Sequence, residues 1–173
     1  MSASFPLSAG RTDEHYTPPE VFEALGCTFD LDPCQPETGR SYLSVPTEHF
    51  YTKQENGLLQ PWHGFVWLNP PFGGRNGVVP WLERFVSHGN GIALVNALTS
   101  CGWFHDYAPK MDALFFPRGK TQFFKPDGER GKSPQNGIVL MALGGRGFRA
   151  LKHAHDVGFG LMVIPHNKKE IEA

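Results

Sequence analysis

Short apolar runs alternate along this chain with stretches in which apolar residues recur at helical spacing. The runs are rich in aromatic and β-branched residues and too short for confident helices, so they predict buried strands. These predicted strands are Cys27–Cys34 (ending in a turn), Phe65–Leu68, Gly91–Val95, Ala113–Phe116, Gly137–Leu143 and Leu161–Ile164. Strands that alternate with helices are typical of an α/β fold with a largely parallel central sheet and helices on both faces. The last two strands follow a basic loop and can include an antiparallel member.

The helical spacing predicts helices at Val78–Val86, Thr99–Tyr107 and Phe148–Val157. A further short helix follows Thr17, which is the expected N-cap. Two prolines suit its first turn, Glu20 completes a capping box, and Gly26 ends it. Residues 42–62 show no clear pattern apart from the end of a strand at Phe50–Tyr51.

The first predicted strand brings acids to its carboxyl end. Alternation places Phe29 and Leu31 on one side and Asp30 and Asp32 on the other. Acids at the carboxyl end of a first strand suit a ligand amino group or ribose hydroxyls, and a solvated acidic face is the other interpretation. Between residues 13 and 37 there are seven acids and no lysine or arginine, which favours a cationic ligand.

The strand Phe65–Leu68 runs directly into Asn69-Pro70-Pro71-Phe72. Two acceptors, the Asn69 side-chain oxygen and the Pro70 carbonyl, can orient an exocyclic amino group such as adenine N6, whose lone pair is delocalised into the ring. Phe72 can stack on the base. The same four residues also suit an ordinary strand-ending turn.

Composition indicates one soluble globular domain. With 173 residues and 40% apolar content, we expect a flexible tail at residues 1–12 and a single domain at residues 13–173, without a secretory signal or a membrane span. The three cysteines and eight histidines are dispersed and show no metal-ligand spacing. We therefore expect a reduced cytoplasmic protein without a structural metal; the oligomeric state is open.

Charge is unevenly distributed along the chain. Residues 1–109 carry 11 acidic and 5 basic side chains, a balance of −6, whereas residues 110–173 carry 6 and 11, a balance of +5. The basic part includes a predicted hairpin loop that holds Arg118, Lys120, Phe123 and Lys125. Cationic and aromatic side chains in one loop suit a nucleic-acid surface, and a solvated loop fits equally well.

Several of these stretches together resemble the small phage-type DNA N6-adenine methyltransferases, the Dam-like enzymes. The matching motifs are D-E-H-Y-T-P-P-E (13–20), F-D-L-D-P-C (29–34), W-L-N-P-P-F (67–72), P-W-L-E-R-F (80–85), G-I-A-L-V-N-A-L-T (91–99), W-F-H-D-Y-A (103–108) and F-F-P-R-G-K-T-Q-F (115–123). The resemblance spans about residues 13–144. It implies a Rossmann-like fold that uses S-adenosylmethionine.

The resemblance also implies roles for individual residues. Tyr16-Thr17-Pro18 would contact the methionine part of the cofactor. Asp32-Pro33-Cys34 would form the cofactor loop, with Asp32 near the amino group and Asp30 also involved. Asn69-Pro70-Pro71-Phe72 would be the catalytic motif, with Asn69 also touching the cofactor. Where such enzymes often carry an acid that binds the adenosine, this sequence has Asn56-Gly57-Leu58.

The predicted function is methyl transfer to adenine N6 in DNA by direct in-line displacement, with DNA as partner and sequence readout by loops. A chain of this length leads us to expect low specificity or a short site. Two alternatives stay open. One is methylation of another planar NH2 group, such as cytosine N4, RNA adenine or a glutamine amide. The other is a DNA-binding module whose cofactor site has decayed.

Overall fold

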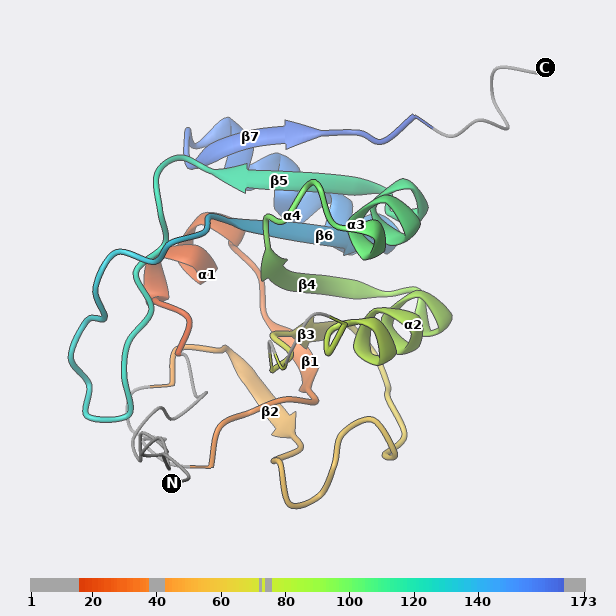
Figure 1. Cartoon of the computed structure of the whole chain (residues 1–173), viewed down its shortest axis with the longest axis vertical. Coiled ribbons are helices and arrows are strands. Elements are labelled where there is room, and N and C mark those ends of the chain that lie inside the picture. The colour runs from red at the N-terminus through yellow and green to blue at the C-terminus, as the bar shows by residue number, and fades with distance from the viewer. Residues whose placement is uncertain (1–15, 38–42, 72, 74–75, 167–173) are drawn as a thin grey trace, which may run out of the picture.

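The computed structural model describes residues 16–37, 43–71, 73 and 76–166 (Figure 1). Within these ranges seven strands form one sheet in the order β2-β1-β3-β4-β6-β5-β7. They are β1 (Phe29–Asp32), β2 (Thr47–Phe50), β3 (Val66–Leu68), β4 (Gly91–Asn96), β5 (Ala113–Pro117), β6 (Ile138–Leu143) and β7 (Gly160–Val163). Each apolar run predicted to be a strand forms one, and β2 is the strand of which only the end was predicted. The expected tail lies outside the described residues.

Strand direction divides the sheet into two halves. The parallel half is β2-β1-β3-β4, in which all three pairings are parallel. The antiparallel half is β6-β5-β7, and all its pairings, including that of β6 with β4, are antiparallel. The α/β class is confirmed, but the prediction of a largely parallel sheet is wrong. Residues 118–137 join β5 to β6 without a helix, and parallel neighbours need a crossover that such a connection does not supply.

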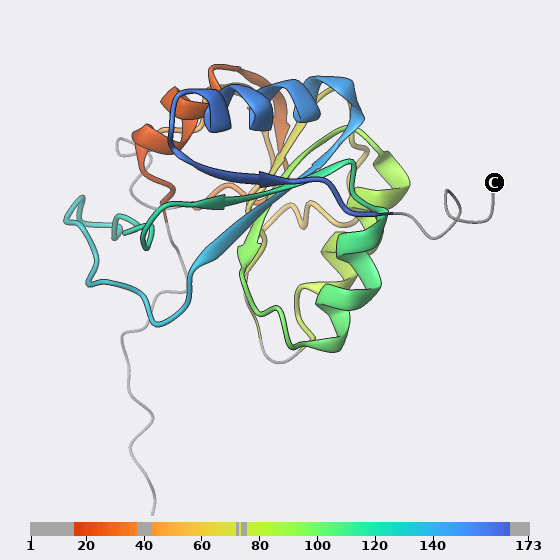
Figure 2. The ribbon, with the colours of Figure 1, turned by 90° about the horizontal axis from the view of Figure 1, so that it is seen from above.

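Helices cover both faces of the sheet, as Figure 2 shows. They are α1 (Pro19–Leu25) and α4 (Gly144–Asp156) on one face, and α2 (Val79–His88) and α3 (Gly102–Tyr107) on the other, with a 3-10 turn at Ala108–Lys110. The prediction began α4 at Phe148, because three glycines in its first turn lower the helix propensity. Gly147 serves close packing there, since a Cβ would lie 2.8 Å from the Gly91 carbonyl oxygen. No helix in the described ranges is long and apolar enough to cross a membrane.

The start of α1 differs from the prediction. The N-cap is Pro18, no side chain caps the helix, and Pro19 occupies its first position. Thr17 and Glu20 therefore do not form a capping box, because both side chains are used in contacts with other parts of the chain. Gly26 ends the helix as predicted, in the left-handed conformation at φ 62°.

The side chains of β1 do not alternate as predicted. Phe29 packs in the cluster under α1 and α4, whereas Leu31 packs in the cluster under α2 and α3. The physical reason is Asp30, whose carboxylate, rather than a backbone carbonyl, accepts the N–H of Phe65 at 2.7 Å. Phe29 still reaches the core, where its ring stacks on that of Phe65 with centroids 5.0 Å apart.

Candidate active site

Two of the predicted motifs follow neighbouring strands of the parallel half. The next strand in sequence, β2, pairs with β1 on one side, and β3 pairs with β1 on the other side. The order of the strands across the sheet therefore reverses at β1. Ligands of open α/β sheets bind at such a switch point, outside the carboxyl ends of the strands. Asp32 ends β1 and Asn69 directly follows β3. Because these strands are parallel, both residues come to the same edge of the sheet.

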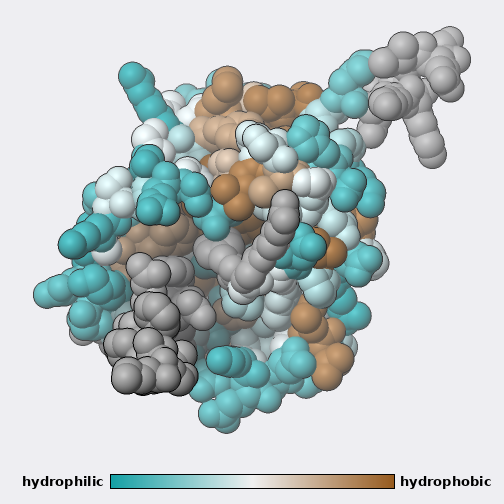
Figure 3. All heavy atoms as spheres, viewed as in Figure 1, coloured by the Kyte–Doolittle hydropathy of each residue, from teal (hydrophilic) through white to brown (hydrophobic). Residues whose placement is uncertain are grey.

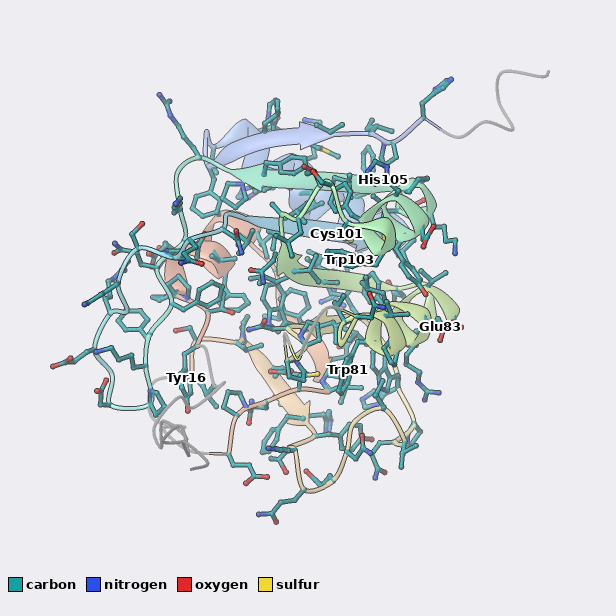
Figure 4. The ribbon with its side chains drawn as sticks, in the orientation of Figure 1. Tyr16, Trp81, Glu83, Cys101, Trp103 and His105 are labelled. Atoms are coloured by element: carbon teal, nitrogen blue, oxygen red, sulfur yellow. The ribbon has the colours of Figure 1, made fainter. Side chains whose placement is uncertain are left out.

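A hydrogen bond joins Asn69 to the segment before α1. The Asn69 Nδ2 donates to Thr17 Oγ1 at 3.3 Å, and Thr17 is only 3% exposed. Its neighbour Tyr16, labelled in Figure 4, is buried and exchanges two backbone hydrogen bonds with Phe124, at 3.1 and 2.9 Å. With its nitrogen directed to Thr17, the amide of Asn69 turns its oxygen away from Thr17. The structure thus brings two predicted motifs into direct contact.

Asp32 is a buried carboxyl group. It is 2% exposed, and one of its oxygens accepts the N–H of Cys34 at 3.0 Å. Burial raises the pKa of Asp32 to about 7, although the hydrogen bond from Cys34 opposes this. A buried carboxylate is stabilised best by a cation, so the position fits a ligand ammonium group. Burial, followed by the nearby Asp32, also raises the pKa of the Cys34 thiol, which keeps it protonated.

Asp30 lies apart from this group. Its carboxylate accepts the Phe65 N–H and pairs with Arg146 at 3.3 Å. Phe65 precedes β3, whereas Asn69 follows it, so Asp30 lies toward the amino end of β3. The structure therefore does not bring Asp30 to Asn69, and the contacts of Asp30 link β1, β3 and α4.

The segment after β2 packs against the turn that follows β1. The Tyr51 N–H donates to the Asp32 carbonyl oxygen at 2.9 Å, and the N–H of the buried Gln35 donates to the Tyr51 carbonyl oxygen. A Cβ on Gly57 would lie 2.0 Å from the Pro33 carbonyl oxygen, so only glycine fits here. Sequence reasoning missed the contribution of Gln35. Its only signal was the position three residues after Asp32.

The four predicted nucleic-acid contacts all lie on the connection between β5 and β6, which we call the basic loop (residues 118–137). Part of it forms a hairpin, in which the Lys125 N–H donates to the Glu129 carbonyl oxygen and the Gly131 N–H to that of Phe123. Lys120 Nζ donates to a backbone carbonyl within the loop, and Lys125 pairs with Glu129 at 3.1 Å. Arg118 is exposed. Figure 3 shows mainly hydrophilic side chains on this side of the molecule, at the left of the view.

An ion pair that sequence reasoning missed fastens the basic loop to α1. Arg130 bonds Glu20 at 2.8 Å, and its guanidinium lies over the Phe124 ring, 4.9 Å from the centroid. Burial opposes ionisation of Glu20, but the hydrogen bonds from Arg130 and from the backbone outweigh it, so the pKa of Glu20 is lowered. Nothing local in the sequence signals this pair, because its members are far apart along the chain.

The remaining residues of the predicted catalytic motif directly follow Asn69 in sequence. Pro70 is buried and Pro71 is exposed, whereas Phe72 lies outside the described residues.

The three cysteines are unpaired, and in the part of the chain that the structure describes no group of three or more His, Cys, Asp or Glu side chains could hold a metal ion.

Comparison with known proteins decides which family carries this arrangement. A family model described as DNA N-6-adenine-methyltransferase (Dam) matches residues 7–157. The chain belongs to the Dam family. The match includes every predicted site residue, from Tyr16 to Lys125, and ends before β7. Searches of curated proteins and of solved structures found no match.

Membership of the Dam family confirms the resemblance that the motifs indicated. It assigns the chain to a family of methyltransferases described as acting on N6 of adenine in DNA.

Proposed function

We propose that this protein transfers a methyl group from S-adenosylmethionine to N6 of adenine in DNA, by direct in-line displacement and without a covalent enzyme intermediate. S-adenosylmethionine would supply a methyl group on a sulfonium: as the bond from N6 to the methyl carbon forms, the bond from sulfur to that carbon breaks and its electron pair stays on the sulfur of S-adenosylhomocysteine. N6 loses one proton during or after the attack. The work of the protein is then to position the acceptor amine and to shield the site from water. The proposal includes a Rossmann-like fold, which the switch point at β1 supports.

The observation that carries the proposal is the contact between Thr17 and Asn69. Thr17 holds the amide nitrogen, so that the amide oxygen serves as an acceptor for one N6 hydrogen. The Pro70 carbonyl accepts the other hydrogen. Together they hold the nitrogen in the orientation needed for attack, which lowers the barrier by fixing the acceptor before reaction.

The residues at the switch point fit the cofactor chemically. Asp32 is a buried carboxyl group whose pKa of about 7 leaves it without full charge until a cation arrives, and the amino group of the cofactor is such a cation. Pro33 and Cys34 continue the turn that would surround it. Tyr16, Thr17 and Pro18 are all buried beside Asn69 and would contact the methionine portion.

The acceptor in this proposal is an adenine that leaves the DNA stack. Phe72 would replace the lost stacking, and Arg118, Lys120, Phe123 and Lys125 on the basic loop would contact the strand. The loop lies beside α1 and hence beside the segment that holds Thr17 (Figure 1). We place the reaction in the cytoplasm and expect recognition of a short or loosely defined site.

The experiment is methyl transfer from labelled S-adenosylmethionine to unmethylated DNA, followed by nucleoside analysis. Asn69→Ala is compared with Asn90→Ala, a matched truncation in the turn before β4, where the Asn90 amide donates to the Gly64 carbonyl oxygen. We expect label in N6-methyladenine with the wild type and with Asn90→Ala. With Asn69→Ala we expect a loss of about 10²-fold or more.

Other outcomes would redirect the proposal. Label in N4-methylcytosine would keep the mechanism and change the acceptor. Cofactor binding without transfer to DNA would point to RNA or to glutamine amides. If the protein showed neither cofactor binding nor methyl transfer, the enzyme hypothesis would be overturned and a DNA-binding module would remain.

A further inference from the structure

A cationic pocket opens between α1 and the basic loop. Its volume is about 150 Å³, and it is lined by both polar and apolar residues. The polar lining consists of Glu20, Arg118, Lys120, Thr121, Gln122 and Arg130, and the apolar lining of Val21, Pro117 and Phe159. Three cations face one carboxylate, so the lining carries a formal balance of +2. Cations, a hydroxyl and an amide together form the donor set that recognises a phosphate.

The pocket lies at the same edge of the sheet as Asn69. β5 is antiparallel to β6, and β6 is antiparallel to β4, so β5 ends at the edge where β3 and β4 end. Arg118 directly follows β5. On the other wall, Glu20 comes three residues after Thr17, and three residues of chain span at most about 11 Å. DNA rises about 3.4 Å per nucleotide along one strand, so this reach covers about three nucleotides.

One wall of the pocket already holds an anion. Glu20 bonds Arg130 at 2.8 Å. The side chain of Glu20 is 39% exposed and that of Arg130 is 47% exposed, so solvent and ligands can reach the pair. A phosphate that enters the pocket competes with this carboxylate for the guanidinium. Arg118 has no such carboxylate partner among the described residues.

We propose that this pocket binds one backbone phosphate of the DNA strand, within about three nucleotides of the target adenine, and that Glu20 competes with this phosphate for Arg130. The proposal rests on the proposed function for its choice of DNA as ligand. It adds a defined phosphate site and a built-in competitor. The site fixes the position of the strand relative to Asn69, because both walls of the pocket are tied to the elements that hold Asn69.

The test measures DNA binding, which does not depend on methyl transfer. The affinity of a short fluorescein-labelled duplex is followed by anisotropy over a range of potassium chloride concentrations. Arg118→Gln is expected to weaken binding and to reduce the salt slope by about 0.9, the loss of one phosphate contact. Lys120→Gln should act in the same direction, and Arg118→Lys should restore the slope. Glu20→Gln is expected to strengthen binding and to raise the slope, because Arg130 is released.

The matched control is Lys110→Gln. Lys110 is an exposed lysine that precedes β5, at the opposite edge of the sheet, and its ammonium lies 4.8 Å from the Tyr107 ring centroid. Its variant should leave both affinity and slope unchanged. Equal slopes for Arg118→Gln, Glu20→Gln and Lys110→Gln would overturn the proposal. Inorganic phosphate should compete with the duplex better than chloride at equal ionic strength, because the pocket takes a phosphate group, and this advantage should be lost in Arg118→Gln.

The two proposals can fail separately. A protein that shows these slopes but transfers no methyl group keeps the pocket and loses the proposed function. A protein that methylates DNA while Arg118→Gln binds like the wild type keeps the function and loses the pocket.

Discussion

The parallel half and the antiparallel half of the sheet reach the same edge with different chemistry. In the parallel half, Asp32 ends β1 and Asn69 directly follows β3, and the nearby Thr17 is almost fully buried. In the antiparallel half, β5 and β6 are joined by the long basic loop, whose cationic side chains are largely exposed. The chain is acidic in its first part, at −6 over residues 1–109, and basic in the rest, at +5.

The difference shows how strand direction sorts function. Parallel neighbours bring the ends of several strands together, and the result is a small buried set of polar groups suited to a cationic cofactor and an amine. An antiparallel connection returns at the edge where it left, so it can extend into solvent and meet a polyanion. Cofactor binding and DNA binding should therefore respond to different substitutions. Three predictions test this separation, and a fourth tests the burial of Asp32.

Asp32→Asn should have the largest effect. A buried charge pair that loses one partner costs about 3–5 kcal/mol, so the Kd for S-adenosylmethionine should rise at least about 10²-fold. In the wild type, the Kd should rise about tenfold per pH unit as pH falls below about 7, because the ionised carboxylate binds the cofactor. The variant should lack this dependence. Calorimetry across pH checks both results, and an equal loss of DNA affinity would refute the separation.

In the protein without ligand, the native Asp32 should lower the stability as pH rises. Its folded pKa of about 7 lies above the ordinary carboxyl value near 3.8, so the folded state binds more protons between these two values. Stability contributed by protonated Asp32 is then complete at low pH and is lost as pH rises toward 7, by up to about 1.4 kcal/mol per pH unit. In urea unfolding, the free energy of unfolding of Asp32→Asn should rise relative to that of the wild type from pH 5 to pH 7. A constant difference across that range would contradict the burial argument.

Thr17→Val should give an intermediate effect on catalysis. Valine keeps the shape of threonine but leaves the Asn69 nitrogen without its acceptor, so kcat should fall about tenfold while the affinity for DNA holds. Thr17→Ser keeps the hydroxyl and should retain most of the activity. Steady-state kinetics measures kcat and calorimetry measures the cofactor Kd, and a raised Kd with kcat intact would show that Thr17 acts through cofactor binding alone and would contradict its role in orienting Asn69.

Lys125→Gln should have the smallest effect. Lys125 is exposed and already pairs with Glu129 at 3.1 Å, so its loss should weaken DNA binding by less than about tenfold and leave the cofactor Kd unchanged. Lys152→Gln is the matched control, since Lys152 forms the same i,i+4 pair with Asp156 on α4. The separation would be weakened if Lys152→Gln lowered DNA affinity as much as Lys125→Gln.

Local patterns predicted the strands and the residues that follow them. The aromatic and β-branched run Phe65–Leu68 favoured a buried strand, and two prolines were expected to end it, so the position of Asn69 followed from sequence. The direction of β6 depended on whether residues 118–137 contain a helix. Their charged and glycine-containing pattern indicated a hairpin loop, and an antiparallel member was allowed among the last two strands; in the structure both β6 and β7 are antiparallel to their neighbours.

Contacts between distant segments could not be predicted in the same way. Thr17 and Glu20 have the spacing of a capping box, which is indistinguishable in sequence from a threonine that binds Asn69 and a glutamate that binds Arg130. Asp30 shows the reverse case. Its spacing to Asp32 suggested a shared face, but its contact with Phe65 settled a different orientation.

The way the basic loop is anchored has a consequence for how such proteins diversify. Phe124 ties the loop to Tyr16, and residues 125–129 form a tip beyond that anchor. Doubling the length of a flexible loop costs only about 0.6 kcal/mol in closure entropy. Insertions or exchanges at the tip thus leave the anchor and Asn69 in place, so a lineage can acquire new target preferences here while inheriting one unchanged reaction.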